Sequence, residues 1–199
     1  MLCNRSKFLS NNDVVNRQFG GLDFSHNGLP ESIIERFMSY PIIITIVGGN
    51  NPSDQELNWA EQIGRGLAER GVVVVTGGGD GVMEAASKGA FEAGGLTVGI
   101  LPGSSPQDAN QYVTIPILTG MSYARNIIVA KTGRVVIAVG GAFGTLSEIA
   151  HALGDGIPTI GLGTWELSRE GIEKDGIVRV RSPKEAVDKA IEIAHNSRS

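Results

Sequence analysis

The sequence predicts a single-domain, doubly wound α/β protein with a Rossmann-like, mostly parallel sheet and helices on both faces. Short, nearly continuous apolar runs alternate with helical segments, which is typical of parallel strands buried on both faces. Many of the 28 glycines stand where a strand or helix ends, as they do in βα units. The 199 residues suffice for one domain with a sizeable core.

Strands are predicted where apolar residues follow one another between turns that contain glycine, proline or asparagine. In chain order these predicted strands are residues 42–47, 72–75, 96–101, 113–118, 134–139, 157–162 and 177–180. Helices are predicted between them, where apolar residues recur every three or four positions. In chain order these predicted helices are residues 57–68, 82–93, 122–131, 146–153 and 183–194.

Signals at the helix ends support several of these elements. Ser53 and Glu56 have the spacing of a capping box ahead of the first predicted helix, and Gly71 closes that helix. Gly133 closes the third. Residues 102–111, rich in Pro, Ser, Asp and Asn, form a loop of the length expected for a lid.

The chain is predicted to divide into an arm and a domain. Residues 1–40 have no sustained hydrophobic period and are interpreted as a peripheral N-terminal arm. A short helix is expected in this arm after Leu29-Pro30-Glu31-Ser32. Residues 41–199 form the Rossmann-like domain.

Bulk composition excludes several classes of protein. The net charge of -4 and the isoelectric point near 5.4 argue against a nucleic-acid surface. No apolar run approaches the ~18 residues that a membrane span needs, and the polar N-terminus predicts a cytoplasmic protein. Cys3 is the only cysteine, which excludes an internal disulfide and a multi-cysteine metal site, and no metal site is predicted.

Two glycine clusters follow predicted strands and open predicted helices, at residues 77–81 and 140–145. Glycine allows backbone N–H groups to approach a ligand closely, and a helix N-terminus attracts negative charge. Because ligands bind at the carboxyl ends of strands in open α/β sheets, we expect a phosphorylated ligand there. The predicted ligand-binding residues are Gly48, Gly49, Thr76, Gly77, Gly78, Gly79, Asp80, Gly81, Gly140, Gly141, Ala142, Phe143, Gly144 and Thr145.

The glycine motifs do not fit two common classes of nucleotide-binding protein. The first strand ends in Gly48-Gly49-Asn50-Asn51-Pro52 and not in G-x-G-x-x-G, and no acidic residue directly follows the second strand. Neither glycine cluster continues into G-K-[ST], so a Walker-type NTPase is excluded as well. The motifs therefore favour a monophosphate-like group over a dinucleotide or a nucleoside triphosphate.

Arg125 and Glu148 are the candidate charged residues of the site. Arg125 lies in a largely apolar predicted helix, where an arginine needs an anionic partner. Arg125 is either part of a structural ion pair or a residue of a functional site, in which case it faces Glu148. Glu148 also stands at capping-box spacing from Thr145, so its carboxylate could instead bind the Thr145 backbone N–H.

Three motifs in this order resemble the Lonely Guy (LOG) superfamily. They are Gly77-Gly78-Gly79-Asp80-Gly81-Val82-Met83, Tyr123-Ala124-Arg125-Asn126 and Gly141-Ala142-Phe143-Gly144-Thr145-Leu146-Ser147-Glu148. LOG enzymes hydrolyse the N-glycosidic bond of cytokinin nucleoside 5′-monophosphates. The resemblance implies that, if this protein is such an enzyme, Arg125 and Glu148 are its catalytic residues. Nothing in these motifs supplies a Schiff-base lysine, so we reject the lysine decarboxylase activity often attached to such proteins.

Departures from the LOG signature resemble the branch that contains molybdenum cofactor (Moco) carrier proteins. Gly140-Gly141-Ala142 replaces Pro-Gly-Gly, Asn126 replaces the lysine after the arginine, and Tyr123 replaces a histidine. The resemblance implies a protein that binds a phosphorylated pterin or nucleotide monophosphate, requires no other cofactor and forms dimers or tetramers. Binding without catalysis is the favoured function, and a LOG-type phosphoribohydrolase is the alternative.

Overall fold

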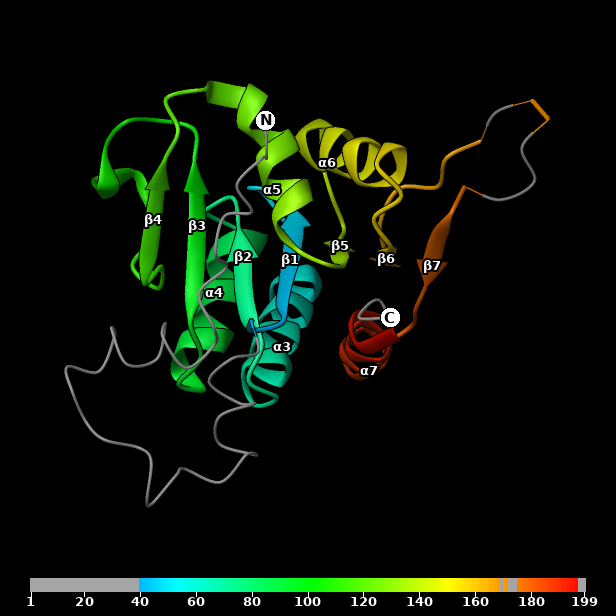
Figure 1. Cartoon of the computed structure of the whole chain (residues 1–199), viewed down its shortest axis with the longest axis horizontal. Coiled ribbons are helices and arrows are strands. Elements are labelled where there is room, and N and C mark those ends of the chain that lie inside the picture. The colour runs from blue at the N-terminus through cyan, green and yellow to red at the C-terminus, as the bar shows by residue number, and fades with distance from the viewer. Residues whose placement is uncertain (1–39, 169, 172–174, 197–199) are drawn as a thin grey trace, which may run out of the picture. The chain divides into compact units, whose positions relative to one another are not determined.

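Seven strands form one parallel sheet in the part of the chain that the computed structural model describes, residues 40–168, 170–171 and 175–196. Their order is β4-β3-β2-β1-β5-β6-β7 (Figure 1). The strands are β1 (Ile43–Gly48), β2 (Val73–Thr76), β3 (Thr97–Leu101), β4 (Ile115–Leu118), β5 (Val136–Val139), β6 (Thr159–Leu162) and β7 (Ile177–Arg179). Each predicted strand is confirmed within two residues at either end, and every pairing is parallel.

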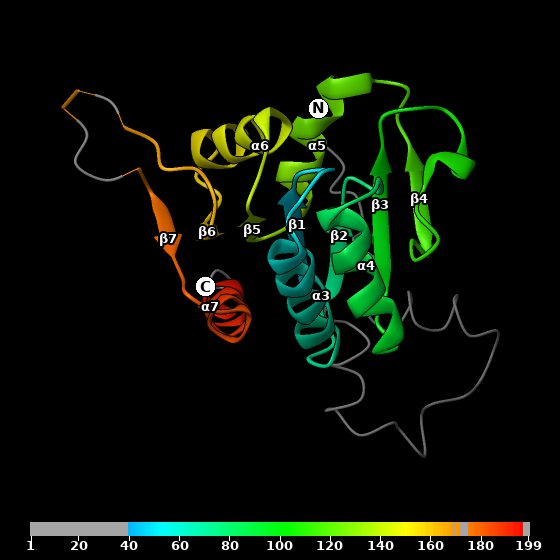
Figure 2. The same cartoon turned by 180° about the vertical axis from the view of Figure 1, so that it is seen from behind.

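Helices cover both faces of this sheet, as Figures 1 and 2 show from opposite sides. The helices are α3 (Asp54–Ala68), α4 (Val82–Glu92), α5 (Asn126–Thr132), α6 (Phe143–Gly154) and α7 (Pro183–Asn196), with short 3-10 helices η1 (Pro106–Asp108) and η2 (Ser122–Arg125). One buried cluster joins α3, α4 and α7 to the sheet, and a second joins α5 and α6 to the opposite face. The predicted doubly wound fold is confirmed.

The predicted helix 122–131 differs from the observed structure. Its first turn is the 3-10 helix η2, and only α5 is α-helical. Ser122 opens the turn with φ +50°, a left-handed conformation that a serine adopts only under local strain. Hydrophobic spacing reports which face is buried but does not distinguish a tight first turn from an α-helical one.

The strand order creates a crevice beside β1. The chain proceeds from β1 outward to β4 and then returns to place β5 on the other side of β1. The loops that leave the carboxyl ends of β1 and β5 therefore run toward opposite faces of the sheet. Doubly wound proteins bind ligands at such a switch point, which predicts a site between Gly48 and Gly141.

Helices α3 and α4 pack so closely that glycine is required at their contact. A Cβ atom on Gly89 would lie 2.0 Å from the backbone oxygen of Glu61, and one on Gly64 would lie 2.0 Å from that of Ala86. Backbone oxygens cannot turn aside as a side-chain end can. The two helices would have to separate to admit even a methyl group.

Gly89→Ala is therefore expected to destabilise the fold by about 2 kcal/mol or more, measured by urea unfolding. Gly154→Ala is the matched control, since a Cβ at Gly154 meets no atom within 4 Å. Helix propensity alone favours alanine by up to about 1 kcal/mol, so this control is expected to be neutral or stabilising. Equal effects of the two substitutions would contradict the close-contact argument.

The predictions for the N-terminal arm lie outside the described residues, apart from Tyr40. Within the described part of the chain, no helix combines the length and the apolar character needed to cross a membrane. Among the same residues, no group of three or more His, Cys, Asp or Glu side chains is arranged to hold a metal ion.

Candidate functional site

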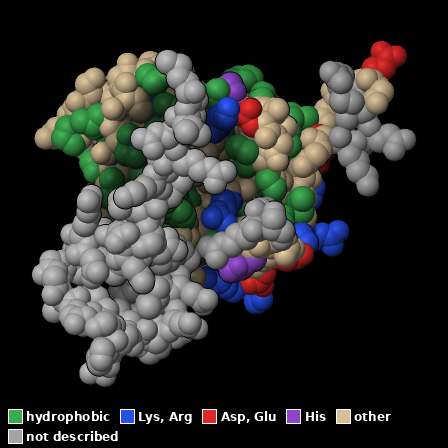
Figure 3. Space-filling model, in the orientation of Figure 1, with side chains coloured by type: hydrophobic (Ala, Val, Ile, Leu, Met, Phe, Trp, Pro, Cys, Tyr) green, Lys and Arg blue, Asp and Glu red, His purple; other side chains and the backbone are tan. Residues whose placement is uncertain are grey.

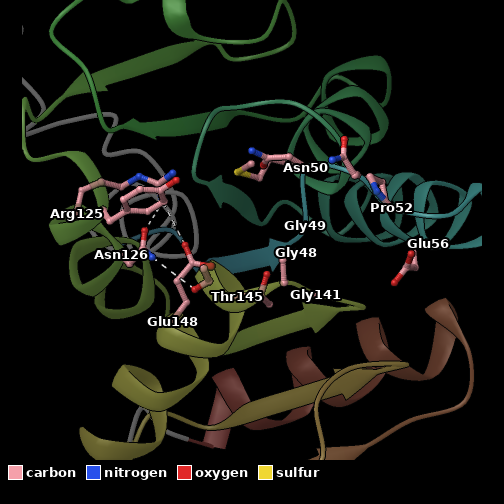
Figure 4. Close-up of a pocket in the computed structure, with 15 residues that line it drawn as sticks. Gly48, Gly49, Asn50, Pro52, Glu56, Arg125, Asn126, Gly141, Thr145 and Glu148 are labelled. Carbon is pink, nitrogen blue, oxygen red and sulfur yellow. Dashed lines mark hydrogen bonds and ion pairs between the residues drawn. The ribbon is translucent and has the colours of Figure 1, made fainter.

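A cavity of about 320 Å³ lies where the sheet topology predicts it, at the carboxyl ends of β1 and β5 (Figure 4). Its lining residues come from the loops after β1 and β5, from α6, and from η2, α5, α3 and α4. They are Gly48, Gly49, Asn50, Asn51, Pro52, Glu56, Met83, Tyr123, Arg125, Asn126, Gly141, Ala142, Gly144, Thr145 and Glu148. In Figure 4 Arg125, Asn126 and Glu148 lie at one end and Asn50, Pro52 and Glu56 at the other.

The glycine loop after β5 presents the N-terminus of α6 to this cavity. Gly140 and Gly141 have φ values of +55° and +133°, which other residues rarely adopt. The N-cap residue, Ala142, has no side chain that could cap the first-turn N–H groups. These donors have no partner within the helix and carry partial positive charge. The loop therefore has the free N–H donors that an anion site would require.

Thr145 adds a hydroxyl to this loop. Thr145 is 2% exposed, and its Oγ1 atom is buried with no hydrogen-bond partner among the described residues. A buried hydroxyl is ordinarily hydrogen-bonded, because leaving it unpaired costs about 1–3 kcal/mol. An oxygen-rich ligand in the cavity would supply the missing partner.

Arg125 and Glu148 form a buried ion pair at one end of the cavity. The Nη1 atom of Arg125 donates to Oε1 of Glu148 at 3.1 Å, and the two side chains are 11% and 7% exposed. Thr145 lies inside α6 rather than at its N-cap, so the capping-box alternative for Glu148 is wrong. The Nε atom of Arg125 is buried without a partner among the described residues, so the arginine retains an unused donor.

Burial dominates the electrostatics of this pair. It raises the pKa of the Glu148 carboxyl to about 7, although the charge and hydrogen bond of Arg125 act in the opposite direction. Burial likewise lowers the pKa of the Arg125 guanidinium, against the attraction of Glu148. A single hydrogen bond does not fully compensate two desolvated charges. An acid with a pKa near neutrality can exchange a proton at physiological pH.

Asn126 fastens the arginine to the start of α6. Its Oδ1 accepts a hydrogen bond from Nη1 of Arg125 at 3.1 Å, and its Nδ2 donates to Oγ of Ser147 at 2.7 Å. Ser147 in turn donates to the backbone oxygen of Gly144 at 2.8 Å. A lysine, which has no acceptor, could not make both contacts. At this position, where the LOG pattern has a lysine, the uncharged Asn126 therefore links Arg125 to α6 by hydrogen bonds.

The second glycine cluster lies at the same sheet edge but outside the cavity lining. A Cβ on Gly77 would lie 2.7 Å from Nη2 of Arg125, so this glycine leaves room for the arginine. A Cβ on Gly81 would lie 2.5 Å from the backbone oxygen of Gly49. Thr76 is fully buried, and its hydroxyl accepts from the N–H of Gly78 at 3.1 Å. The cluster supports the walls of the cavity from behind.

The structure brings together part of the predicted site. The predicted residues that line the cavity are Gly48, Gly49, Arg125, Gly141, Ala142, Gly144, Thr145 and Glu148. Those outside the lining are Thr76, Gly77, Gly78, Gly79, Asp80, Gly81, Gly140 and Phe143. The Phe143 side chain is 80% exposed, and its ring lies 5.7 Å from that of Trp165, centroid to centroid.

Several lining residues were not predicted as ligand contacts: Asn50, Asn51, Pro52, Glu56, Met83, Tyr123 and Asn126. Glu56 was recognised only as half of a capping box. That box is confirmed, because the Glu56 carboxylate binds the Ser53 backbone N–H while Ser53 accepts from the Glu56 N–H. Tyr123 and Asn126 stood out only as departures from the LOG motif. Their position in the sequence beside Arg125 was the signal that could have identified them as lining residues.

A parallel sheet with a glycine loop and a buried Arg–Glu pair at its switch point defines a Rossmann-like protein of the LOG type. The chain belongs to the SLOG cluster4 family, whose model matches residues 41–187. The predicted LOG resemblance is thereby confirmed. A curated relative, an uncharacterised protein of Archaeoglobus fulgidus, is 36% identical over 148 residues, which are 74% of this chain and 93% of the relative.

Two solved structures resemble this chain closely. The molybdenum cofactor binding protein of the phototrophic bacterium Rippkaea orientalis matches with a TM-score of 0.71 and 38% identity, over 78% of this chain and 98% of its own. The molybdenum cofactor carrier protein of Chlamydomonas reinhardtii matches with a TM-score of 0.69 and 32% identity, over 77% of this chain and 99% of its own.

Proposed function

We propose that this protein binds and carries a phosphorylated pterin of the molybdenum cofactor type. The observation that carries the proposal is the pair of buried, unpartnered polar atoms, Thr145 Oγ1 and Arg125 Nε, on residues that line one cavity beside an uncapped helix N-terminus. A terminal phosphate satisfies such donors by charge-assisted hydrogen bonds. Similarity to the two molybdenum cofactor proteins supports the choice of a pterin over other phosphate esters.

The residues present fit such a ligand. The cavity, of about 320 Å³, falls at the lower end of the range of ligand pockets, ~300–1,000 Å³. The start of α6 and Arg125 would hold the phosphate. Asn50 and Asn51 offer amide groups to other polar atoms of the ligand.

Native mass spectrometry of the purified full-length protein tests this function. We expect a retained phosphorylated pterin, or saturable uptake of added 6-hydroxymethylpterin monophosphate. Thr145→Val removes one hydrogen bond to a charged group and should weaken uptake about tenfold or more. Thr164→Val is the matched control, because Thr164 Oγ1 is also buried and unpartnered but Thr164 does not line the cavity. Equal losses, or no uptake by the wild type, would refute the proposal.

A nucleoside 5′-monophosphate phosphoribohydrolase is the second candidate, and one observation favours it. Glu148 lies in the cavity wall, and its pKa of about 7 suits a general base at neutral pH. In that reaction Glu148 would activate water or stabilise the developing sugar cation, and Arg125 would orient the carboxylate. A carrier needs the same pair only to organise the site.

Release of free adenine from AMP distinguishes the two candidates. A carrier releases none, and this is the expected result. If the wild type releases adenine and Glu148→Gln lowers the rate by about 10²–10⁴-fold while phosphate binding survives, the protein is a phosphoribohydrolase instead.

The protein is also proposed to form a homo-oligomer, a dimer or tetramer, through its β4 edge. The apolar residues Ile127, Ile128, Val129 and Ala130 of α5 also suggest a contact, but Val129 and Ala130 are buried within the chain, and of the four only Ile128, at 36%, is among the exposed large apolar residues. Edge strand β4 and the turn after it expose Ile115, Ile117, Leu118 and Met121, each more than 40% exposed. Figure 3 shows hydrophobic side chains gathered over this edge. Exposed apolar edge strands commonly pair with another chain.

Light scattering is expected to give a mass above that of the 20.9 kDa monomer, and Ile117→Lys is expected to lower it to the monomer. Val178→Lys provides the control on the opposite edge strand β7, where Val178 is 37% exposed. A monomeric wild type at micromolar concentration would contradict the oligomer, and dissociation by Val178→Lys alone would place the contact at β7.

A further inference from the structure

Tyr123 is the only aromatic side chain among the described residues that line the cavity. Its side chain is 83% exposed, although a large apolar ring in water gains by being covered. It follows Ser122, the only described non-glycine residue with a positive φ. Strained backbone of this kind clusters at ligand sites. The turn thus holds an uncovered ring at the cavity wall, two residues before Arg125.

The two ends of the cavity differ in chemistry. The lining of the far end consists of Asn50, Asn51, Pro52 and Glu56. The carboxylate of Glu56 repels any second anionic group of a ligand at this end. At the Arg125 end the lining includes Tyr123, two residues before the arginine. A phosphate bound at the start of α6 would lie between the two ends, because Gly141 and Thr145 lie between them in Figure 4. The end with Tyr123 and Arg125 is the one suited to a flat ring, because such rings stack on aromatic and guanidinium planes.

We propose that Tyr123 is a specificity-determining residue that stacks on the planar heteroaromatic ring, a purine or pterin, of a ligand whose phosphate binds the glycine loop. This inference rests on the proposed phosphate site and adds the ring that the site selects. The tyrosine contributes affinity for the ring and none for the phosphate. The phenol oxygen is not required, so phenylalanine serves equally well.

Calorimetric titration of the full-length protein with three compounds tests this inference. AMP carries a purine, 6-hydroxymethylpterin monophosphate carries a pterin, and ribose 5-phosphate carries the phosphate alone. Tyr123→Ala is expected to weaken binding of at least one ring compound about tenfold and to leave ribose 5-phosphate unchanged. Tyr123→Phe should behave as the wild type. The ring with the larger loss identifies the class of ligand.

Phe143→Ala is the matched control, since Phe143 is 80% exposed at the same sheet edge but lies outside the lining. It should change none of the three affinities. An equal loss for all three compounds in Tyr123→Ala, no loss for any, or a change only in oligomeric mass would overturn the inference. Failure of the wild type to bind any of them would instead refute the phosphate site itself.

Discussion

Arg125→Met is expected to abolish ligand retention and to destabilise the fold by about 3 kcal/mol. The methionine keeps most of the side-chain volume but removes the charge that opposes Glu148. Glu148, which is 7% exposed at its side chain, is then buried without a cation, and breaking such a pair typically costs ~3–5 kcal/mol. Protonation of Glu148 relieves part of this penalty, so the lower end of the range is expected. Urea unfolding at pH 7 measures the stability.

The matched control for this substitution is Arg70→Met. Arg70 forms an ion pair with Asp188 at 2.8 Å, but both side chains are about 40% exposed. Exposed pairs contribute only ~0–1 kcal/mol, so this variant should remain close to the wild type in stability and binding. A loss in Arg70→Met equal to that in Arg125→Met would show that burial of the pair is not the cause.

The double variant Arg125→Met/Glu148→Gln separates stability from binding. It contains no unpaired buried charge, so its stability should recover most of the loss, whereas ligand retention should not return, because the cation is still absent. If the double variant retained ligand as the wild type does, Arg125 would act only as the structural partner of Glu148. That outcome would favour the structural reading of the arginine.

Stability is expected to fall as the pH rises from about 4.5 to 7. The Glu148 carboxyl has a pKa of about 7 in the folded chain against an ordinary value of 4.5. Between these values the folded chain binds a proton that the unfolded chain has released, so raising the pH favours unfolding. This loss in the free energy of unfolding is absent below pH 4.5 and complete above about pH 7. It amounts to about 3 kcal/mol or less.

Thermal unfolding at pH 5 and pH 7.5 checks this dependence. Glu148→Gln should remove most of it, because glutamine keeps a hydrogen-bond acceptor for Arg125 and does not titrate. Glu61→Gln is a suitable control, since Glu61 pairs with Lys88 at a partly exposed position. A wild type that is equally stable at both values, or a Glu148→Gln variant with an unchanged dependence, would contradict the raised pKa.

The order of the elements could be predicted from the sequence alone, because the burial of each strand and helix determines the pattern of apolar residues within it. Apolar runs such as Ile43–Gly48 and the periodic faces of α3 and α6 report their own environment. The Ser53–Glu56 capping box and the glycine turn before α6 are likewise local, since helix ends are satisfied by their neighbours in sequence. These features predicted the fold and the glycine loop that forms one wall of the cavity.

Only the tertiary structure decided which loops meet and which charges pair. Arg125 and Glu148 are separated by 23 residues, and the sequence left open a structural ion pair for Arg125, a functional pair of Arg125 with Glu148, and a cap for Glu148. Strand order puts β5 beside β1, so the loop after β1 lines the cavity while the cluster 77–81 supports it from behind. Proximity of this kind depends on how the strands assemble, and the residues within a single strand or helix carry no record of it.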